Sequence, residues 1–204
     1  MISGLVLAAG TSSRLGRPKQ LLDLGGKPVI RHVVEAALAA PLDDVLVVLG
    51  HRAAEIAAAL PGDERVHHVA NERFAEGMST SLAAGLERLQ QSDDCEAAVV
   101  LLGDQPSVRA EAIEAVVQAF RNGHGPVVQA AYGGVSAHPT LFARSAWSDL
   151  QPALHGDMGA GHFLALHPEV VWPVELGGTA PLDIDTEDDY RRVRAQFDSG
   201  HWSD

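Results

Sequence analysis

Cysteine is nearly absent from this sequence of 204 residues, since Cys95 stands alone. A single cysteine excludes an intramolecular disulfide and a cysteine-rich zinc or iron–sulfur site. Long apolar runs are also missing: no stretch of about 18 apolar residues occurs, so no transmembrane helix is expected. The first ten residues, MISGLVLAAG, lack the charged start of a secretory signal. We therefore expect a cytoplasmic protein that does not enter a membrane.

Basic residues are scarce as well. The chain carries 15 Lys and Arg against 27 Asp and Glu, which gives a formal net charge of −12. Nucleic-acid binding needs clustered positive charge, so this composition argues against a nucleic-acid partner. A small phosphate ligand needs only a local cationic loop. Hydrophobic residues make up 46% of the chain, and its length predicts a single domain over residues 1–204 with a polar tail at 198–204.

Short β-branched runs alternate along the chain with longer segments rich in Ala and Leu. The pattern predicts strands at residues 4–8, 45–49, 66–70, 98–102, 126–131 and 170–174. It predicts helices at residues 30–40, 53–60, 79–90, 109–120 and 186–197. Ser79 is the predicted N-cap of the third helix, and Thr186 with Asp189 forms the capping pattern of the last.

This alternation of strands and helices predicts an α/β fold, with an open, mostly parallel sheet and helices on both faces. In such folds ligands bind in the crevice beyond the carboxyl ends of the strands. We therefore expect the loops that follow residues 8, 49, 70 and 102 to line the site.

The loop after the first strand has the composition of a phosphate-binding loop. The segment reads LAAGTSSRLGRPKQLL, and its small residues Gly10, Ser12 and Ser13 let backbone N–H groups approach an anion closely. Arg14 and Lys19 add positive charge within a protein that is otherwise acidic. The segment matches neither G-x-x-x-x-G-K-[ST] nor G-x-G-x-x-G, so the two best-known nucleotide loops are excluded. We predict a triphosphate-binding loop of another type.

The motif L-A-A-G-x-S-x-R-x-G-x-P-K, residues 7–19, resembles the opening of the NTP-transferase family of the molybdenum-cofactor type. It is most similar to the molybdenum cofactor cytidylyltransferases. The guanylyltransferase branch has L-A-G-G where this chain has Leu7, Ala8, Ala9 and Gly10, which favours CTP over GTP. The resemblance implies a Rossmann-like nucleotidyltransferase fold that requires Mg²⁺. It also implies transfer of CMP to a phosphorylated small-molecule acceptor, molybdopterin, and transient contact with an enzyme that receives the cofactor.

Carboxylates at two places predict a magnesium site. The run AVVLLGDQP puts Asp104 at the carboxyl end of a buried strand, and Mg²⁺ takes one or two carboxylates together with phosphate oxygens. Asp183 and Asp185 alternate on an extended segment and therefore point the same way. Either of the two would complete the site. The family's L-G-D-Q-P and D-I-D-T-P-E-D patterns resemble both segments, with Glu187 in place of the proline.

The segment GMSTS opens the predicted third helix, where free N–H groups and hydroxyls can hydrogen-bond the edge of a base. In the resembling family this segment reads the nucleobase, which implies this role for Gly77, Ser79 and Ser81. The backbone of Ala8 and Ala9 would complete the base pocket.

Two later segments resemble the acceptor side of the family, H-P-x-x-F and G-D-x-G-A-R. The resemblance, together with the residue after Asp104, assigns four residues to the acceptor: Gln105, His138, Pro139 and Asp157. The chain departs from these patterns at Gly161, where the family has arginine, and at Ala137, where it has glycine.

Other functions use the same kind of crevice. One is an NAD(P)H-dependent reductase, and another is a non-catalytic module that binds a pterin cofactor and hands it to an enzyme. Fold alone does not separate them. A sugar-nucleotide or methylerythritol-type cytidylyltransferase would share the proposed chemistry. The missing G-x-G-x-x-G and the presence of Asp104 with Lys19 favour a triphosphate and a metal over a dinucleotide.

Overall fold

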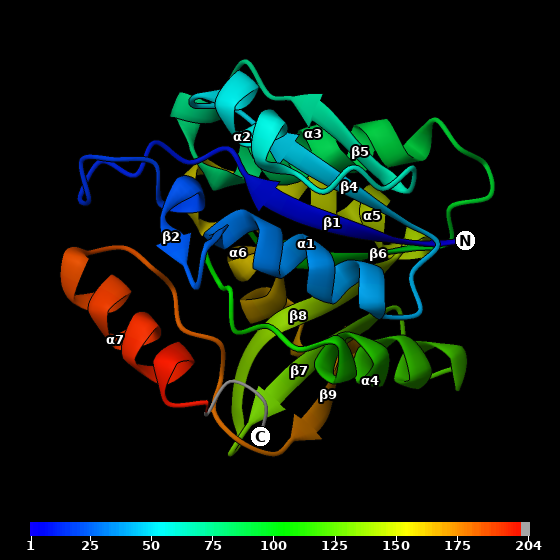
Figure 1. Cartoon of the computed structure of the whole chain (residues 1–204). Helices are drawn as coiled ribbons and strands as arrows, with labels where there is room; N and C mark the ends of the chain where they lie inside the picture. Colours follow the sequence, from blue (N-terminus) through cyan, green and yellow to red (C-terminus); the bar gives the residue numbers. More distant parts are fainter. Residues whose placement is uncertain (201–204) are drawn as a thin grey trace.

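The computed structural model describes residues 1–200 and contains a seven-stranded sheet in the order β5-β4-β1-β6-β8-β7-β9 (Figure 1). The strands are β1 (Ile2–Ala8), β4 (Asp44–Leu49), β5 (Val66–Ala70), β6 (Ala97–Leu102), β7 (Val127–Tyr132), β8 (Val135–Ala143) and β9 (Val171–Leu176). Strand β8 runs antiparallel to both of its neighbours, and the other pairings are parallel. This architecture confirms the predicted open, mostly parallel α/β fold.

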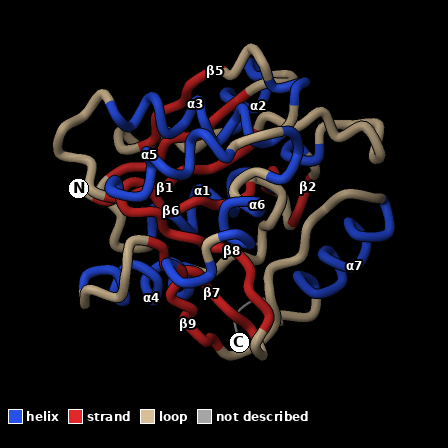
Figure 2. The backbone as a smooth tube through the Cα atoms, turned by 180° about the vertical axis from the view of Figure 1, so that it is seen from behind, coloured by secondary structure: helices blue, strands red, loops and turns tan. Residues whose placement is uncertain are grey.

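Helices cover both faces of the sheet (Figures 1 and 2). They are α1 (Val29–Ala39), α2 (Ala53–Ala59), α3 (Met78–Gln90), α4 (Ala110–Arg121), α5 (Arg144–Leu150), α6 (Gly161–Leu166) and α7 (Glu187–Asp198). Strand β1 is buried along its whole length, with Val6 packed toward α1 and α4 and Leu5 toward α3. Because side chains alternate along a strand, its hydrophobic run supplies two cores at once. None of the helices within residues 1–200 is long and apolar enough to cross a membrane.

Short elements complete the description. The 3-10 helices are η1 (Lys19–Leu21), η2 (Phe74–Glu76), η3 (Gln151–Ala153), η4 (Gly156–Met158) and η5 (Pro168–Val170). A hairpin of β2 (Asp23–Leu24) and β3 (Lys27–Pro28) follows the first loop.

Strand β8 and helices α5 and α6 were not predicted from the sequence. The pairing of β7 with β8 is irregular: Gln129 pairs with Thr140, whereas the next residue, Ala130, pairs with Ala137. Residues 138–139 therefore bulge out of β8. A bulge breaks the period-two alternation by which a strand is recognised, and such bulges are common beside active sites.

The prediction that Ser79 is an N-cap is wrong. Helix α3 begins at Met78 with Gly77 as its N-cap residue, and Ser79 is buried in the first turn, where its Oγ donates to the carbonyl oxygen of Gly159 at 3.4 Å. Gly77 has φ of +117°, and a Cβ there would lie 2.4 Å from the carbonyl oxygen of Gly156. The close approach of this loop requires glycine where the helix begins.

The last helix begins as the sequence predicts. The Thr186 hydroxyl accepts from the Asp189 N–H at 3.2 Å, and the Asp189 carboxylate accepts from the Thr186 N–H at 2.8 Å. Helix α7 lies beside β2 (Figure 1), in an apolar cluster that includes Leu24, Ile184 and Tyr190. This packing brings residues near the carboxyl end of the chain next to the loop that follows β1. The last four residues of the predicted tail, 201–204, lie outside the described residues.

Candidate active site

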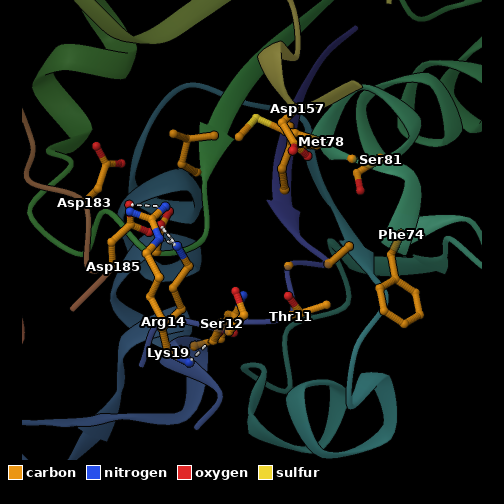
Figure 3. Close-up of a pocket in the computed structure, with 18 of the residues that line it drawn as sticks. Thr11, Ser12, Arg14, Lys19, Phe74, Met78, Ser81, Asp157, Asp183 and Asp185 are labelled. Atoms are coloured by element: carbon orange, nitrogen blue, oxygen red, sulfur yellow. Dashed lines mark hydrogen bonds and ion pairs between the residues drawn. The ribbon is translucent and has the colours of Figure 1, made fainter. Parts of the chain in front are cut away.

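A cavity of about 590 Å³ lies at the carboxyl ends of β1 and β6 (Figure 3). Its walls come from the loop after β1, the residues after β6, the start of α3, the η4 segment and the segment before α7. The loops after β1, β5 and β6 contribute as expected. The loop after β4 contributes none of the described lining residues; instead, the His51 N–H donates to the carbonyl oxygen of Ala9 at 3.2 Å.

Most of the predicted site residues meet in this cavity. It is lined by Leu7, Ala9, Gly10, Ser12, Ser13, Arg14, Lys19, Gly77, Ser81, Asp104, Asp157, Asp183 and Asp185. Five predicted site residues do not line it: Ala8, Ser79, Gln105, His138 and Pro139. Further lining residues were not assigned from the sequence: Thr11, Gln20, Phe74, Ala75, Met78 and Leu102. Their positions within or next to the motifs are the one signal that could have identified them.

Lys19 is the centre of the charged end of the cavity. Its ammonium group contacts the Asp104 carboxylate and lies 2.9 Å from Asp185 Oδ1. Arg14 Nη2 lies 3.0 Å from Asp185 Oδ2. Burial disfavours the charge of Lys19, but the nearby Asp104 and Asp185 outweigh it, so the pKa of Lys19 lies above its usual value. Lys19 is therefore positively charged at neutral pH.

The loop after β1 holds Lys19 in place through Ser12. Ser12 adopts a left-handed conformation with φ of +54°, and its carbonyl oxygen accepts from the N–H groups of Leu15 and Gly16. The Ser12 hydroxyl accepts from the Lys19 N–H at 3.1 Å, at the start of η1. A non-glycine residue in this region is uncommon and is found where the surroundings fix the backbone. The turn thus aims Lys19 at the ends of β1 and β6.

The segment before α7 is tied to the end of β6. The Ile184 N–H donates to the carbonyl oxygen of Asp104 at 3.2 Å. Gln105 Nε2 donates to Asp183 Oδ1 at 2.9 Å, so the Gln105 side chain holds Asp183 and does not itself reach the cavity. Burial, followed by the negative charge of Asp104, raises the pKa of Asp183 above its ordinary range. Asp183 thereby joins Asp104 and Asp185 in the wall of the cavity, although only the latter two contact Lys19.

These carboxylates fit a magnesium ion that arrives with a phosphate. No group of three or more His, Cys, Asp or Glu side chains within residues 1–200 is arranged as a closed metal site. Mg²⁺ does not need one, because it takes one or two carboxylates and fills its other positions with water and phosphate oxygens. Asp104 and Asp185, on either side of Lys19, would supply that number of ligands.

The other end of the cavity, the apolar end, has Phe74, Ala75 and Met78 in its wall (Figure 3). Two polar side chains also lie at this end: Asp157 beside Met78, and Ser81, whose Oγ accepts from Asn71 Nδ2 at 3.0 Å. A hydroxyl that accepts can also donate, and Ser81 lines the cavity, so it is a candidate donor to a ligand. This end suits a flat, weakly polar group with one hydrogen-bond acceptor.

Besides Gln105, two predicted acceptor residues do not line the cavity. His138 and Pro139 form the bulge of β8, and His138 Nδ1 lies 3.2 Å from the carbonyl oxygen of Val100. Burial lowers the pKa of His138 below its ordinary value, so this histidine is neutral at neutral pH. Asp157, in contrast, reaches the cavity beside Met78 (Figure 3).

A family model described as "MobA-like NTP transferase domain" matches residues 4–170. Among solved structures, Rv0371c from Mycobacterium tuberculosis H37Rv is 31% identical over 95% of this chain and 97% of its own, with a TM-score of 0.84. A manganese complex of Rv0371c is also similar, at 30% identity over 95% of this chain and 98% of that one, with a TM-score of 0.79. The nucleotidyl transferase Mth528 from Methanothermobacter thermautotroptrophicus is 28% identical over 98% of this chain and 99% of its own, with a TM-score of 0.80.

One curated relative carries a different activity in its name. Nicotine blue oxidoreductase from Paenarthrobacter nicotinovorans is 27% identical over 94% of this chain and 96% of its own. Another curated relative, the bifunctional protein GlmU from Burkholderia orbicola, is 32% identical over 58% of this chain. The matched part covers 26% of the length of that relative.

Proposed function

The chain belongs to the MobA-like NTP transferase domain family, and from that membership we propose that it transfers CMP from CTP to a phosphorylated acceptor, molybdopterin. The observation that carries the proposal is the charged end of the cavity. There, two cations and three carboxylates converge at the carboxyl ends of β1 and β6. A triphosphate with a divalent cation has the charges that this arrangement complements.

The proposed reaction joins two anions. An oxygen of the acceptor phosphate attacks the α-phosphorus of CTP, the bond from that phosphorus to the bridging oxygen breaks, and pyrophosphate leaves. Two unit charges ~4 Å apart repel by about 1 kcal/mol in water and about 4 kcal/mol at an effective dielectric of ~20. Lys19 and Arg14 offset this repulsion and neutralise charge on the leaving group. The acceptor phosphate is already ionised, so no side chain has to remove a proton.

A bound magnesium ion would supply further charge neutralisation of the phosphates. Asp104 and one of Asp183 and Asp185 would hold it. Asp185 is the better candidate, because it lines the cavity beside Lys19 and Arg14, whereas Asp183 is engaged by Gln105. The manganese in the Rv0371c complex supports a divalent cation in this family.

The apolar end of the cavity would take the base. Ser81 would donate to an acceptor on its edge, and Ala9 in the loop after β1 favours cytosine over guanine by resemblance. Asp157, beside Met78 (Figure 3), would face the acceptor.

Pyrophosphate release tests the proposal directly. The purified protein is mixed with molybdopterin, Mg²⁺ and each of the four NTPs. We expect release with CTP, and no release when Mg²⁺ or molybdopterin is omitted. Release with another nucleotide alone would correct the base. Binding of CTP and molybdopterin without release would instead favour a non-catalytic carrier.

An oxidoreductase is the second candidate, because nicotine blue oxidoreductase aligns with nearly the whole chain. It predicts that NADH or NADPH binds and is consumed with a heteroaromatic acceptor. The carboxylates around Lys19 argue against it, since a dinucleotide pyrophosphate does not need a metal and would be repelled by them. NADH fluorescence in the absence of Mg²⁺ distinguishes the two functions.

A further inference from the structure

The two cations at the charged end already occupy the carboxylates that would hold a metal ion. Asp185 is contacted on both oxygens, by Lys19 at 2.9 Å and by Arg14 at 3.0 Å, and Asp104 is contacted by Lys19. We propose that Arg14 and Lys19 compete with the divalent cation for these carboxylates, so that the metal and the triphosphate bind in a mutually dependent way. The inference deepens the proposed function and rests on it for the identity of the triphosphate.

A divalent cation alone meets resistance at this site. It must approach Asp185 and Asp104 within a few Å of the Lys19 ammonium group and the Arg14 guanidinium group, which repel it. It would also leave both side chains without their carboxylate partners. The Lys19 ammonium group cannot easily move from the carboxylates into water, because its side chain is only 16% exposed and its backbone N–H is held by Ser12. A partly buried cation without a partner is costly.

A triphosphate removes both obstacles. Its oxygens accept from lysine and arginine at least as well as a carboxylate does. When Lys19 and Arg14 turn to the phosphates, the oxygens of Asp104 and Asp185 are freed for the metal, and every charge keeps a partner. Each ligand therefore prepares the site for the other, and the coupling is reciprocal by thermodynamic necessity.

Arg14 is the side chain best placed to exchange first. It is 70% exposed and reaches Asp185 from the loop after β1 (Figure 3), so it can turn away without disturbing the core. Arg17 offers a matched control. It lies in the same loop and pairs with Glu187 at 2.8 Å, but it does not line the cavity.

The test measures Mn²⁺ binding by electron paramagnetic resonance, with and without CTP, in the wild type, Arg14→Gln and Arg17→Gln. Without nucleotide, Arg14→Gln should bind Mn²⁺ about fivefold more tightly than the wild type, and Arg17→Gln should match it. With CTP, the enhancement of Mn²⁺ binding should be about fivefold smaller in Arg14→Gln. In an Asp185→Asn background, Arg14→Gln should leave Mn²⁺ binding without nucleotide nearly unchanged, because the contested carboxylate is gone.

Unchanged or weaker Mn²⁺ binding by Arg14→Gln without nucleotide would overturn the inference. So would an equal effect of Arg17→Gln, because a general charge effect would then explain the result. If no NTP changes Mn²⁺ affinity in the wild type, the proposed coupling fails. Pyrophosphate release with CTP, molybdopterin and Mg²⁺, measured separately, then decides whether the proposed function fails with it.

Discussion

The two ends of the cavity are built in different ways. The charged end is assembled from side chains that are far apart in the sequence, from Arg14 to Asp185, and they are linked to one another by ion pairs. The apolar end comes mainly from one stretch around the start of α3, with Ser81 held by a single hydrogen bond from Asn71. The contrast indicates that the two ends have different roles in the proposed reaction. We expect changes at the charged end to lower the rate strongly, and changes at the apolar end to alter which base is accepted.

Replacing Asp104 should have the largest effect. Asp104→Asn removes a carboxylate that contacts Lys19 and is the first candidate ligand for Mg²⁺. Losing the charge neutralisation that a metal provides costs several kcal/mol of transition-state stabilisation, on the order of a thousandfold in rate. A titration of pyrophosphate release against Mg²⁺ checks this. Full stimulation by Mg²⁺ in the variant would remove Asp104 from the metal site.

Replacing Lys19 should come next. Lys19→Ala removes one preorganised donor from the charged end, which costs about 3 kcal/mol, or roughly a hundredfold in kcat/KM. Arg17→Gln is the control, since Arg17 pairs with Glu187 outside the cavity. Steady-state kinetics of pyrophosphate release measure both. A loss of less than about tenfold in Lys19→Ala would break the contrast between the two ends.

A change at the apolar end should alter selectivity more than rate. Ser81→Ala removes the hydroxyl that faces the cavity and should reduce the preference for the favoured base by about fivefold, the value of one net hydrogen bond of about 1 kcal/mol. Thr80→Val is the matched control, because Thr80 Oγ1 also accepts from Asn71, at 2.9 Å, but does not line the cavity. Competition between two NTPs for the same enzyme gives the ratio of their kcat/KM values, which measures this preference. An equal shift in both variants would trace the effect to Asn71 and not to a contact with the base.

The smallest effect concerns the stability of α7, whose preceding segment carries Asp185 into the charged end. The hydrogen bond from Thr186 lowers the pKa of Asp189 to about 2, from an ordinary value of 3.8. A carboxyl group whose pKa is lowered in the folded state stabilises the fold at pH values above its pKa in the unfolded chain. This contribution is lost as the pH falls through about 2. Asp189→Asn should therefore lower the free energy of unfolding at neutral pH, and its difference from the wild type should shrink between about pH 4 and pH 2.

Denaturant unfolding at several pH values measures that difference. Asp188→Asn is the neighbouring control, since Asp188 pairs with Arg191 on the exposed surface and has no role in the cap. A pH-independent difference for Asp189→Asn would contradict the capping account.

The sequence predicted the parallel half of the sheet better than the antiparallel half. Buried parallel strands such as β1 and β4 are continuous apolar runs bounded by helices, and local patterns reveal them. Strand β8 was missed because its bulge at residues 138–139 interrupts the alternation, and its pairing with β6 is a long-range contact.

The residues of the site were predictable where they stand in contiguous motifs, and their long-range contacts were not. The motif around Lys19 is contiguous, and the position of Asp104 follows from the end of a buried strand. The ion pairs of Asp185 with Lys19 and Arg14 were not predictable, because they depend on the packing of α7 against the β2–β3 hairpin. The contact of Gln105 with Asp183 likewise depends on the backbone bond that joins the two segments.

Thermal stabilisation by nucleotides tests the central claim most directly, because it needs no acceptor. The melting temperature is measured with each NTP and with NADH, with and without Mg²⁺, for the wild type and Lys19→Ala. We expect a rise with CTP that requires Mg²⁺ and is lost in Lys19→Ala, since a ligand that binds only the folded state stabilises it. A rise with NADH that is indifferent to Mg²⁺, and none with any NTP, would contradict this expectation.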